Sequence, residues 1–216
     1  REGSAFYDFF NPDRIVIGGS DQKGLNQCTE LYESFDCEKI ITDSNSSQMI
    51  KYLSNTYLAM RLSFVNETYR LVSEFNGNPE EVLNAIGKDK RIGNDYFRPS
   101  PGWGGSCFPK DVKEVISSFQ MDYQLPIISE ILRSNELHME WFVDYILKII
   151  NEQSFENIVL IGAPFKENTD DLRESPSLKI YKLIEEKFKN VWILDFDIPL
   201  SKSFKAIKSL SELKDN

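Results

Sequence analysis

The sequence contains few of the residues that metal sites and disulfide frameworks need. Its 216 residues include three cysteines, Cys28, Cys37 and Cys107, and a single histidine, His138. The number of cysteines is odd, and no CxxC pair or Cys/His cluster has metal-ligand spacing. We therefore expect no metal site, reduced thiols and a cytoplasmic protein. We expect His138 on the surface of a helix and outside catalysis.

Long apolar runs and excess positive charge are also missing. No apolar run is long enough to span a bilayer, and no signal peptide is recognisable. The net charge is −9, which argues against a nucleic acid or a membrane surface as the partner. The chain begins at Arg1 without Met and contains no GxGxxG after a strand. These two absences suggest an excerpt of a longer protein or a processed product.

One stretch reads as a chemical site. It is GWGGSCFPKD, Gly102 to Asp111, in which three glycines in four positions precede Cys107. Glycines without side chains let backbone amides approach a ligand closely. Pro109 fits the first turn of a helix that apolar spacing extends to Phe119. Cys107 would then lie just ahead of a helix N-terminus, whose partial positive charge favours a thiolate. The alternative is that Cys107 is a small buried residue beside an ordinary loop.

The rest of the pattern predicts α/β segments on either side of an all-α centre. Short continuous apolar, β-branched runs predict buried strands, and 3.6-residue spacing predicts helices. Expected strands are 14–19, 39–42, 157–162 and 191–195, and expected helices are 22–35, 47–76, 79–87, 126–151 and 175–188. Cys28 falls on the apolar face of the first helix, so we expect it in the core. The expected domains are residues 1–44, 45–152 and 153–216.

The long helix carries an unusual polar set. Lys51, Asn55 and Asn66 share one face beside its apolar stripe, because their separations are close to whole turns. Buried polar groups of this kind destabilise a protein unless they have partners. The face is therefore either a site or a solvated surface, and spacing alone does not decide between them.

A resemblance to a known family bears on two open questions. One is whether Cys107 is reactive or only buried, and the other is whether the polar face of the long helix is a site or a solvated surface. GWGGSCFPKD is similar to the active-site signature of the nucleotide-sugar 6-dehydrogenases, the UDP-glucose/GDP-mannose dehydrogenase family. MIKYLSNTYLAMRLSFVNE, residues 49–67, resembles the long helix of that family's central domain, and REGSAFYDFFNPDRIVIGG resembles the end of its NAD domain. The resemblance implies the tail of an N-terminal Rossmann-like domain, a long-helix dimerisation domain and the start of a C-terminal Rossmann-like UDP-binding domain.

The resemblance also implies roles for individual residues. Cys107 would be the nucleophile, Lys51 and Asn55 would stabilise oxyanions, Asp111 would activate water, and Glu2 would lie beside the reacting carbon. Substrate contacts are expected from Arg91, Tyr96, Phe97, Arg98, Trp103, Gly104, Phe165 and Lys166, and a contact to the NAD phosphates from Arg173. Arg91 would reach the site of the neighbouring subunit in a homodimer. Glu2 could instead be a solvated terminal residue, and Trp103 could equally anchor its loop on the core.

The activity implied is an NAD-dependent four-electron oxidation of a nucleotide sugar at C6, from alcohol to carboxylate. UDP-glucose is favoured as the substrate over GDP-mannose and UDP-N-acetylhexosamines. An excerpt without most of the NAD-binding part is expected to be inactive by itself. Two other classes stay open: a non-catalytic dimerisation module, and a thiol redox sensor. A sensor would explain Cys107 but not Lys51, Asn55 or the loop around Lys166.

Overall fold

A computed structural model describes residues 3–118, 125–153, 155–196 and 204–214. The chain divides into two compact units, Arg1–Asn55 and Thr56–Asn216, and each is described by itself. The boundary falls inside the long helix α3 (Ser44–Glu74). Glu2, one of the predicted catalytic residues, lies outside the described residues.

The first unit is built around two parallel strands. It contains α1 (Ala5–Phe10), β1 (Arg14–Gly18), α2 (Gln22–Leu31), β2 (Glu38–Thr42) and the beginning of α3. The strands pair in register from Arg14 opposite Glu38 to Gly18 opposite Thr42. Gly18 is tight against α3, since a Cβ on it would lie 1.9 Å from Ser47 Oγ. The unit is therefore the β-α-β arrangement that the sequence predicts.

A cap fixes where α3 begins. Asp43 precedes the helix, and its Oδ1 accepts a hydrogen bond of 2.9 Å from the backbone N–H of Ser46. Hydrogen bonds from the Ser46 hydroxyl and backbone lower the pKa of Asp43, because both stabilise the carboxylate. Asp43 therefore caps the helix, which starts at Ser44, three residues earlier than expected.

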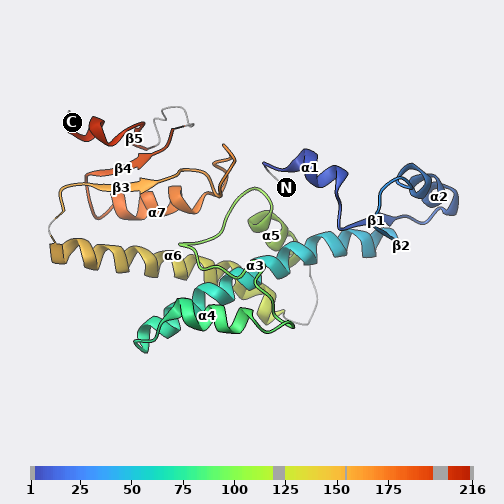
Figure 1. Ribbon diagram of the computed structural model, residues 1–216, viewed down its shortest axis with the longest axis horizontal. Helices are drawn as coiled ribbons and strands as arrows, with labels where there is room; N and C mark the ends of the chain where they lie inside the picture. Colours follow the sequence, from blue (N-terminus) through green and yellow to red (C-terminus); the bar gives the residue numbers. More distant parts are fainter. Residues whose placement is uncertain (1–2, 119–124, 154, 197–203, 215–216) are drawn as a thin grey trace. The chain divides into compact units, whose positions relative to one another are not determined.

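The second unit joins a helical centre to a small sheet. After the remainder of α3 come α4 (Pro79–Gly87), α5 (Phe108–Ser118) and α6 (Pro126–Gln153). The sheet segment contains β3 (Ile158–Ile161), α7 (Pro176–Glu185), β4 (Val191–Leu194), β5 (Ala206–Ile207) and the 3₁₀ helix η1 (Leu210–Lys214). The strands are parallel in the order β3-β4-β5, and α7 lies between the sheet and α6 (Figure 1).

Three apolar clusters hold this second unit together. The largest joins α6, α7 and the sheet, with Val143, Ile180, Ile184 and Ile193 each at most 2% exposed. A second joins Ala59 of α3, Trp103, Val112 of α5 and Ile131 of α6. A third joins Val65, Leu83 and Phe97. The predicted class, an all-α centre between α/β segments in chain order, is confirmed.

Two residues are placed differently from expectation. Cys28 is exposed and α2 has no buried residue, although the spacing predicted a core position. The described part of this unit is two strands wide, so the apolar face of α2 has little to pack against. His138 is only 2% exposed, whereas we expected it on the helix surface. It is buried because the chain after α4 passes over its face of α6, and its Nε2 lies 2.8 Å from the Ser100 carbonyl oxygen.

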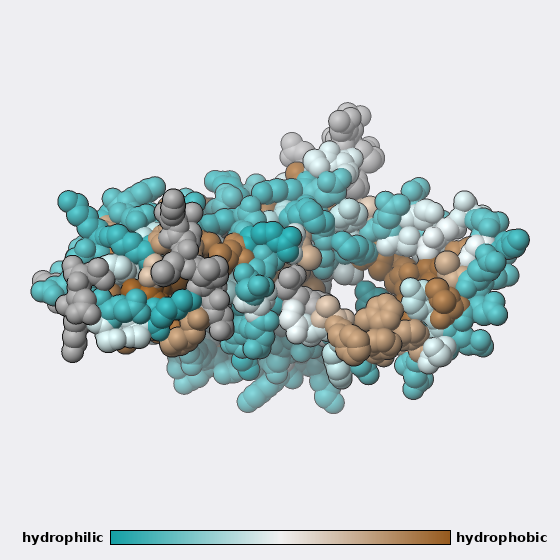
Figure 2. Space-filling model, turned by 90° about the horizontal axis from the view of Figure 1, so that it is seen from above, coloured by the Kyte–Doolittle hydropathy of each residue, from teal (hydrophilic) through white to brown (hydrophobic). Residues whose placement is uncertain are grey.

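The surface combines hydrophilic cover with apolar patches (Figure 2). Several large side chains of α3 are exposed, among them Tyr57 at 54%, Phe64 at 55% and Leu71 at 60%. These three are spaced by seven residues, so they lie along one side of the helix. No helix among the described residues is both long enough and apolar enough to cross a membrane.

Candidate active site

Cys107 lies at the N-terminus of α5. Its carbonyl oxygen accepts the first bond of the helix, 2.8 Å from the backbone nitrogen of Asp111. The helix is anchored by Val112 and Val115, which are 0% and 4% exposed. The thiol itself is exposed, with Ser106 Oγ 3.7 Å from its sulfur. The predicted position ahead of a helix N-terminus is confirmed, and the alternative of a buried packing cysteine is wrong.

A buried carboxylate follows one turn later. Asp111 is 0% exposed and forms an ion pair with Lys110, whose side chain is 60% exposed. Burying a carboxylate without such a partner would be destabilising. Because Asp111 lies beneath the surface that carries Cys107, it can act on water at the thiol only through a relay or after a side-chain movement.

The glycines of the loop are needed for close packing within the protein. A Cβ on Gly104 would lie 1.9 Å from the carbonyl oxygen of Glu174, and one on Gly105 would lie 2.7 Å from the ring of Phe165. Gly105 also has a positive φ of 85°, a conformation that side chains disfavour. The loop that leads to Cys107 is thus in direct contact with the segment that contains Phe165 and Glu174.

A cleft of about 600 Å³ opens beside this contact. It is lined by Gly105, Ser106, Pro109, Lys110, Lys113, Glu114, Ser117, Arg173 and Glu174. Three of these side chains are cationic and two are acidic, so the lining favours an anionic ligand over a cationic one. Lys113, Glu114 and Ser117 were not predicted from the sequence. Their helical spacing from Lys110 was the available signal, because it places them on the same side of α5.

Arg173 is held by a neighbouring carboxylate. Its Nε lies 2.8 Å from Asp171 Oδ1, and its Nη2 lies 2.7 Å from Asp171 Oδ2. These hydrogen bonds from the guanidinium lower the pKa of Asp171. The arginine side chain is still 66% exposed, so one edge of it can meet a ligand. Among the described residues, no three His, Cys, Asp or Glu side chains gather where a metal ion could bind.

Phe165 and Lys166 lie at the beginning of the segment that ends with Arg173 and Glu174. Lys166 is exposed, and its Nζ lies 5.5 Å from the centre of the Phe165 ring. Since that ring packs on Gly105, the lysine is placed near the glycine loop by a short chain of contacts. The structure therefore brings together predicted site residues from two separate stretches of the chain: Gly104, Cys107 and Asp111 from the first, and Phe165, Lys166 and Arg173 from the second.

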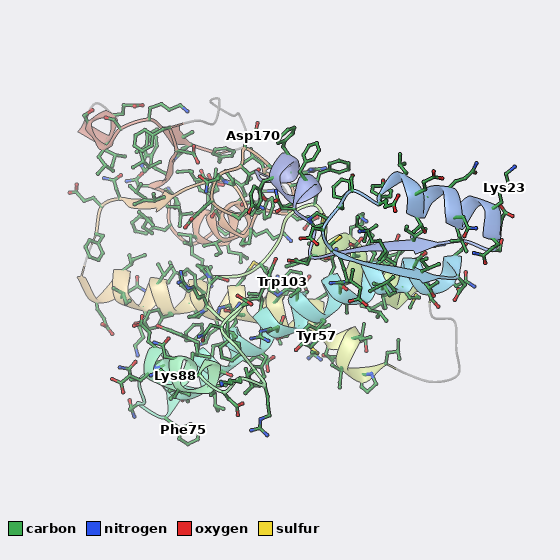
Figure 3. All side chains as sticks on the ribbon, turned by 45° about the vertical axis from the view of Figure 1, so that its right-hand side comes forward. Lys23, Tyr57, Phe75, Lys88, Trp103 and Asp170 are labelled. Carbon is green, nitrogen blue, oxygen red and sulfur yellow. The ribbon has the colours of Figure 1, made fainter. Side chains whose placement is uncertain are left out.

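The loop before the glycines has accessible and buried members. Arg91 is 88% exposed on its side chain and pairs with Asp89 at 2.6 Å. Tyr96 is 40% exposed and Arg98 is also exposed. Phe97 and Trp103 are 7% and 4% exposed, and Trp103 Nε1 donates to Ser63 Oγ over 2.9 Å in the helical centre (Figure 3). Phe97 and Trp103 thus anchor the loop, and any contact of theirs to a ligand stays a prediction.

Lys51 and Asn55 belong to the first unit. They lie one turn apart on α3, as predicted, with Lys51 exposed and Asn55 partly exposed. The Lys51 ammonium lies 5.1 Å from the centre of the Tyr52 ring. Their grouping with Cys107, which belongs to the second unit, stays a prediction. Asn66, farther along α3, is buried and accepts a hydrogen bond of 2.9 Å from the Ser100 backbone.

Three models of one family match the chain in order. The NAD binding domain of the UDP-glucose/GDP-mannose dehydrogenase family matches residues 1–36. The central domain of that family matches residues 45–137, and its UDP binding domain matches residues 159–216. The matches to the second and third models cover the glycine loop and the Phe165–Arg173 segment respectively.

Individual relatives agree with these matches. UDP-glucose 6-dehydrogenase YwqF of Bacillus subtilis is 39% identical over 181 residues, which are 83% of this chain and 41% of that protein. A UDP-glucose 6-dehydrogenase of Rickettsia felis is 34% identical over 91% of this chain and 45% of its own length. A UDP-glucose dehydrogenase structure from Pyrobaculum islandicum has a TM-score of 0.87 at 33% identity, covering 100% of this chain and 52% of that one. The chain spans about half the length of these relatives, and it belongs to the UDP-glucose/GDP-mannose dehydrogenase family.

Proposed function

We propose that the full-length protein oxidises a UDP-sugar at C6 with NAD, and that UDP-glucose is converted to UDP-glucuronate. The observation that carries this proposal is the exposed Cys107 thiol at the N-terminus of α5, beside a cleft whose lining has three cationic and two acidic side chains. A helix N-terminus stabilises a thiolate, and a thiolate is the form that attacks a carbonyl carbon. The proposed domain boundaries are 1–44, 45–152 and 153–216.

The residues of the cleft fit the charge of the expected ligands. Lys110, Lys113 and Arg173 present ammonium and guanidinium groups at its edge, and both NAD and UDP-sugars carry a pyrophosphate. We assign Arg173 to the NAD phosphates, and Phe165 and Lys166 to the sugar nucleotide. NAD, when bound, supplies the oxidising power by accepting one hydride at each of two successive oxidations.

Cys107 holds the substrate covalently between the two oxidations. The first oxidation removes a hydride from C6 and a proton from its hydroxyl, which leaves an aldehyde. The thiolate adds to the aldehyde carbon, and the resulting oxyanion takes a proton to give a thiohemiacetal. Loss of the second hydride and a proton gives a thioester, and water then cleaves the C–S bond to release the carboxylate and the thiol. Covalent attachment keeps the reactive aldehyde from escaping.

Lys51 and Asn55 are the proposed donors to the oxygen that develops charge. Removal of one such donor typically lowers kcat by about 10²–10³. Asp111, which is 0% exposed, is the proposed base for the attacking water, through a relay or after a side-chain movement. Glu2 is proposed beside the reacting carbon, together with Tyr96, Arg98, Trp103 and Gly104 along the substrate. We place this chemistry in the cytoplasm, because the nucleophile must remain reduced.

We further propose a homodimer formed through α3. Its exposed Tyr57, Phe64 and Leu71 form a one-sided apolar stripe, which a second copy of the helix would cover. Arg91, with 88% of its side chain exposed, would then be available to the neighbouring subunit's substrate. Sedimentation of the full-length protein tests this assembly, with Phe64→Glu expected to shift it toward the monomer.

NADH formation by the full-length protein tests the activity. UDP-glucose is assayed beside UDP-N-acetylglucosamine and GDP-mannose, and we expect two NADH per UDP-glucose. Cys107→Ser should permit the first oxidation but stop before the acid, while the matched variant Cys28→Ser, at an exposed position on α2, should behave as wild type. Normal glucuronate production by Cys107→Ser would disprove the role of this thiol. A folded protein that forms no NADH with any of the sugars would favour the non-catalytic dimerisation module instead.

A further inference from the structure

The segment from Ser100 to Trp103 is held by side chains. Among the described residues, the stretch 98–103 of this loop has no backbone–backbone hydrogen bond. Buried backbone groups without partners are costly, so a buried loop of this kind requires partners from elsewhere. Those partners determine where its backbone lies.

Three buried polar side chains supply them. Asn66 of α3 is 1% exposed, and its Oδ1 accepts from the Ser100 N–H at 2.9 Å. Asn135 of α6 is 5% exposed, and its Oδ1 accepts from the Trp103 N–H at 3.0 Å. Its Nδ2 donates to the Trp103 carbonyl at 2.8 Å, so one amide satisfies both backbone groups of Trp103.

His138 completes the set at the Ser100 end. Its Nε2 lies 2.8 Å from the Ser100 carbonyl oxygen, which can only accept, so Nε2 carries the proton and donates. The ring stacks on Trp141, with centroids 5.6 Å apart and planes 24° from parallel. The loop is also close to α6 at Gly102, since a Cβ on this residue would lie 2.7 Å from Met139 Cγ. Ser100 and Trp103 are therefore fixed at both their N–H and their C=O groups.

We propose that Asn66, Asn135 and His138 form a clamp that positions the glycine loop for the reaction. The inference rests on the proposed function, because the loop carries the expected substrate contacts Trp103 and Gly104. None of the three is a catalytic residue; each acts through the loop backbone. Four residues after Trp103 comes Cys107, so loosening Ser100–Trp103 also loosens the approach to the nucleophile. A displacement of about 1 Å in such a segment can lower the rate by about 10²-fold.

The test compares substitutions that keep or remove the hydrogen bond in the full-length protein. His138→Leu keeps an apolar side chain of similar volume but loses the donor, and His138→Gln restores an N–H near the position of Nε2. Asn135→Ala removes both bonds to Trp103, and Glu140→Gln, at an exposed position on α6, is the control. Amide hydrogen exchange of peptides covering residues 98–106 reports on the clamp without any turnover, and kcat/KM for UDP-glucose reports on positioning.

The clamp predicts that exchange in this peptide rises about tenfold in His138→Leu, as expected for the loss of one hydrogen bond, and by at least as much in Asn135→Ala, which loses two. In the same variants kcat/KM should fall about 10- to 100-fold, and His138→Gln should restore most of both properties. Unchanged exchange in both variants would overturn the clamp. Faster exchange with unchanged kcat/KM would overturn the positioning role, and equal loss in His138→Leu and His138→Gln would overturn the contribution of His138. If the wild-type protein oxidises no sugar nucleotide, the proposed function fails, and exchange alone decides the clamp.

Discussion

Gly104→Ala should destabilise the protein through overlap with the 174–176 segment. The added methyl carbon would lie 1.9 Å from the Glu174 carbonyl oxygen and 2.9 Å from Pro176 Cδ. Carbon and oxygen normally approach no closer than about 3.3 Å, so one of the two backbone segments must move by about 1.4 Å. The neighbouring oxygen belongs to the backbone, so a change of side-chain rotamer cannot relieve the overlap. Overpacking of this kind typically costs about 1–3 kcal/mol, and we expect the upper part of that range.

Gly24→Ala is the matched control, because it makes the same chemical change at a site where only a flexible side chain must move, by about 0.1 Å. Gly24 lies within α2, and the nearest atom to its added Cβ would be Asp21 Oδ2 at 3.2 Å. Alanine is favoured over glycine inside a helix by about 0.5–1 kcal/mol, so this variant should be more stable than wild type.

Urea denaturation of the full-length variants, followed by circular dichroism, measures both effects. The expected order of the free energy of unfolding is Gly24→Ala above wild type, and wild type well above Gly104→Ala. The reasoning fails if Gly104→Ala unfolds within about 0.5 kcal/mol of wild type, since that is the ordinary range for surface substitutions without a contact. In that case the glycine would serve ligand approach, as its position in the motif first suggested.

Three further changes test other parts of the structure. Because burial holds the pKa of His138 below its ordinary value of 6.5, the unfolded chain binds the proton first as the pH falls. The free energy of unfolding should therefore be at its full value above pH 6.5 and decline below it, and His138→Gln should flatten that decline. Lys113→Gln should raise the KM for NAD about fivefold, as expected for one exposed charge contact of about 1 kcal/mol. Asn78→Ala should lower the free energy of unfolding by about 1 kcal/mol in urea, since Asn78 Oδ1 caps α4 at 3.1 Å from the Glu80 nitrogen.

The elements that the sequence predicted well are those with local signals at their ends. The starts of α4 and α7 were expected within one residue of Pro79 and Pro176, and the side chains just before these prolines, Asn78 and Ser175, cap the two helices. The end of α2 was predicted too late, at residue 35, because its apolar spacing continues after the backbone leaves the helix at Tyr32. Periodicity reports which side chains share a face, but not where the hydrogen bonds of the helix stop.

Burial was less predictable than secondary structure. Cys28 and His138 both occupy helices at periodic positions, yet the first is exposed and the second is buried. The difference in exposure depends on whether another segment packs over the helix face that carries each residue. The Ser100 carbonyl that contacts His138 is 38 residues away in the sequence. No pattern in the sequence links residues so far apart. Asn135 and Trp103 are likewise 32 residues apart, so their pairing was not predictable from the spacing of either motif.

The glycine loop was identified correctly from the sequence, but the reason inferred for its glycines was incomplete. Three glycines beside a cysteine indicated that something must come close to the backbone, and the sequence suggested a ligand. In the structure it is the Phe165–Glu174 segment that comes close, at Gly104 and Gly105. This contact brings Arg173 to the cleft beside Lys110, at the start of the helix that Cys107 precedes. The same glycines therefore connect the segment matched by the UDP binding domain to the one that carries the thiol. The cleft beside Lys110 and Arg173 depends on that packing as much as on the charges that line it.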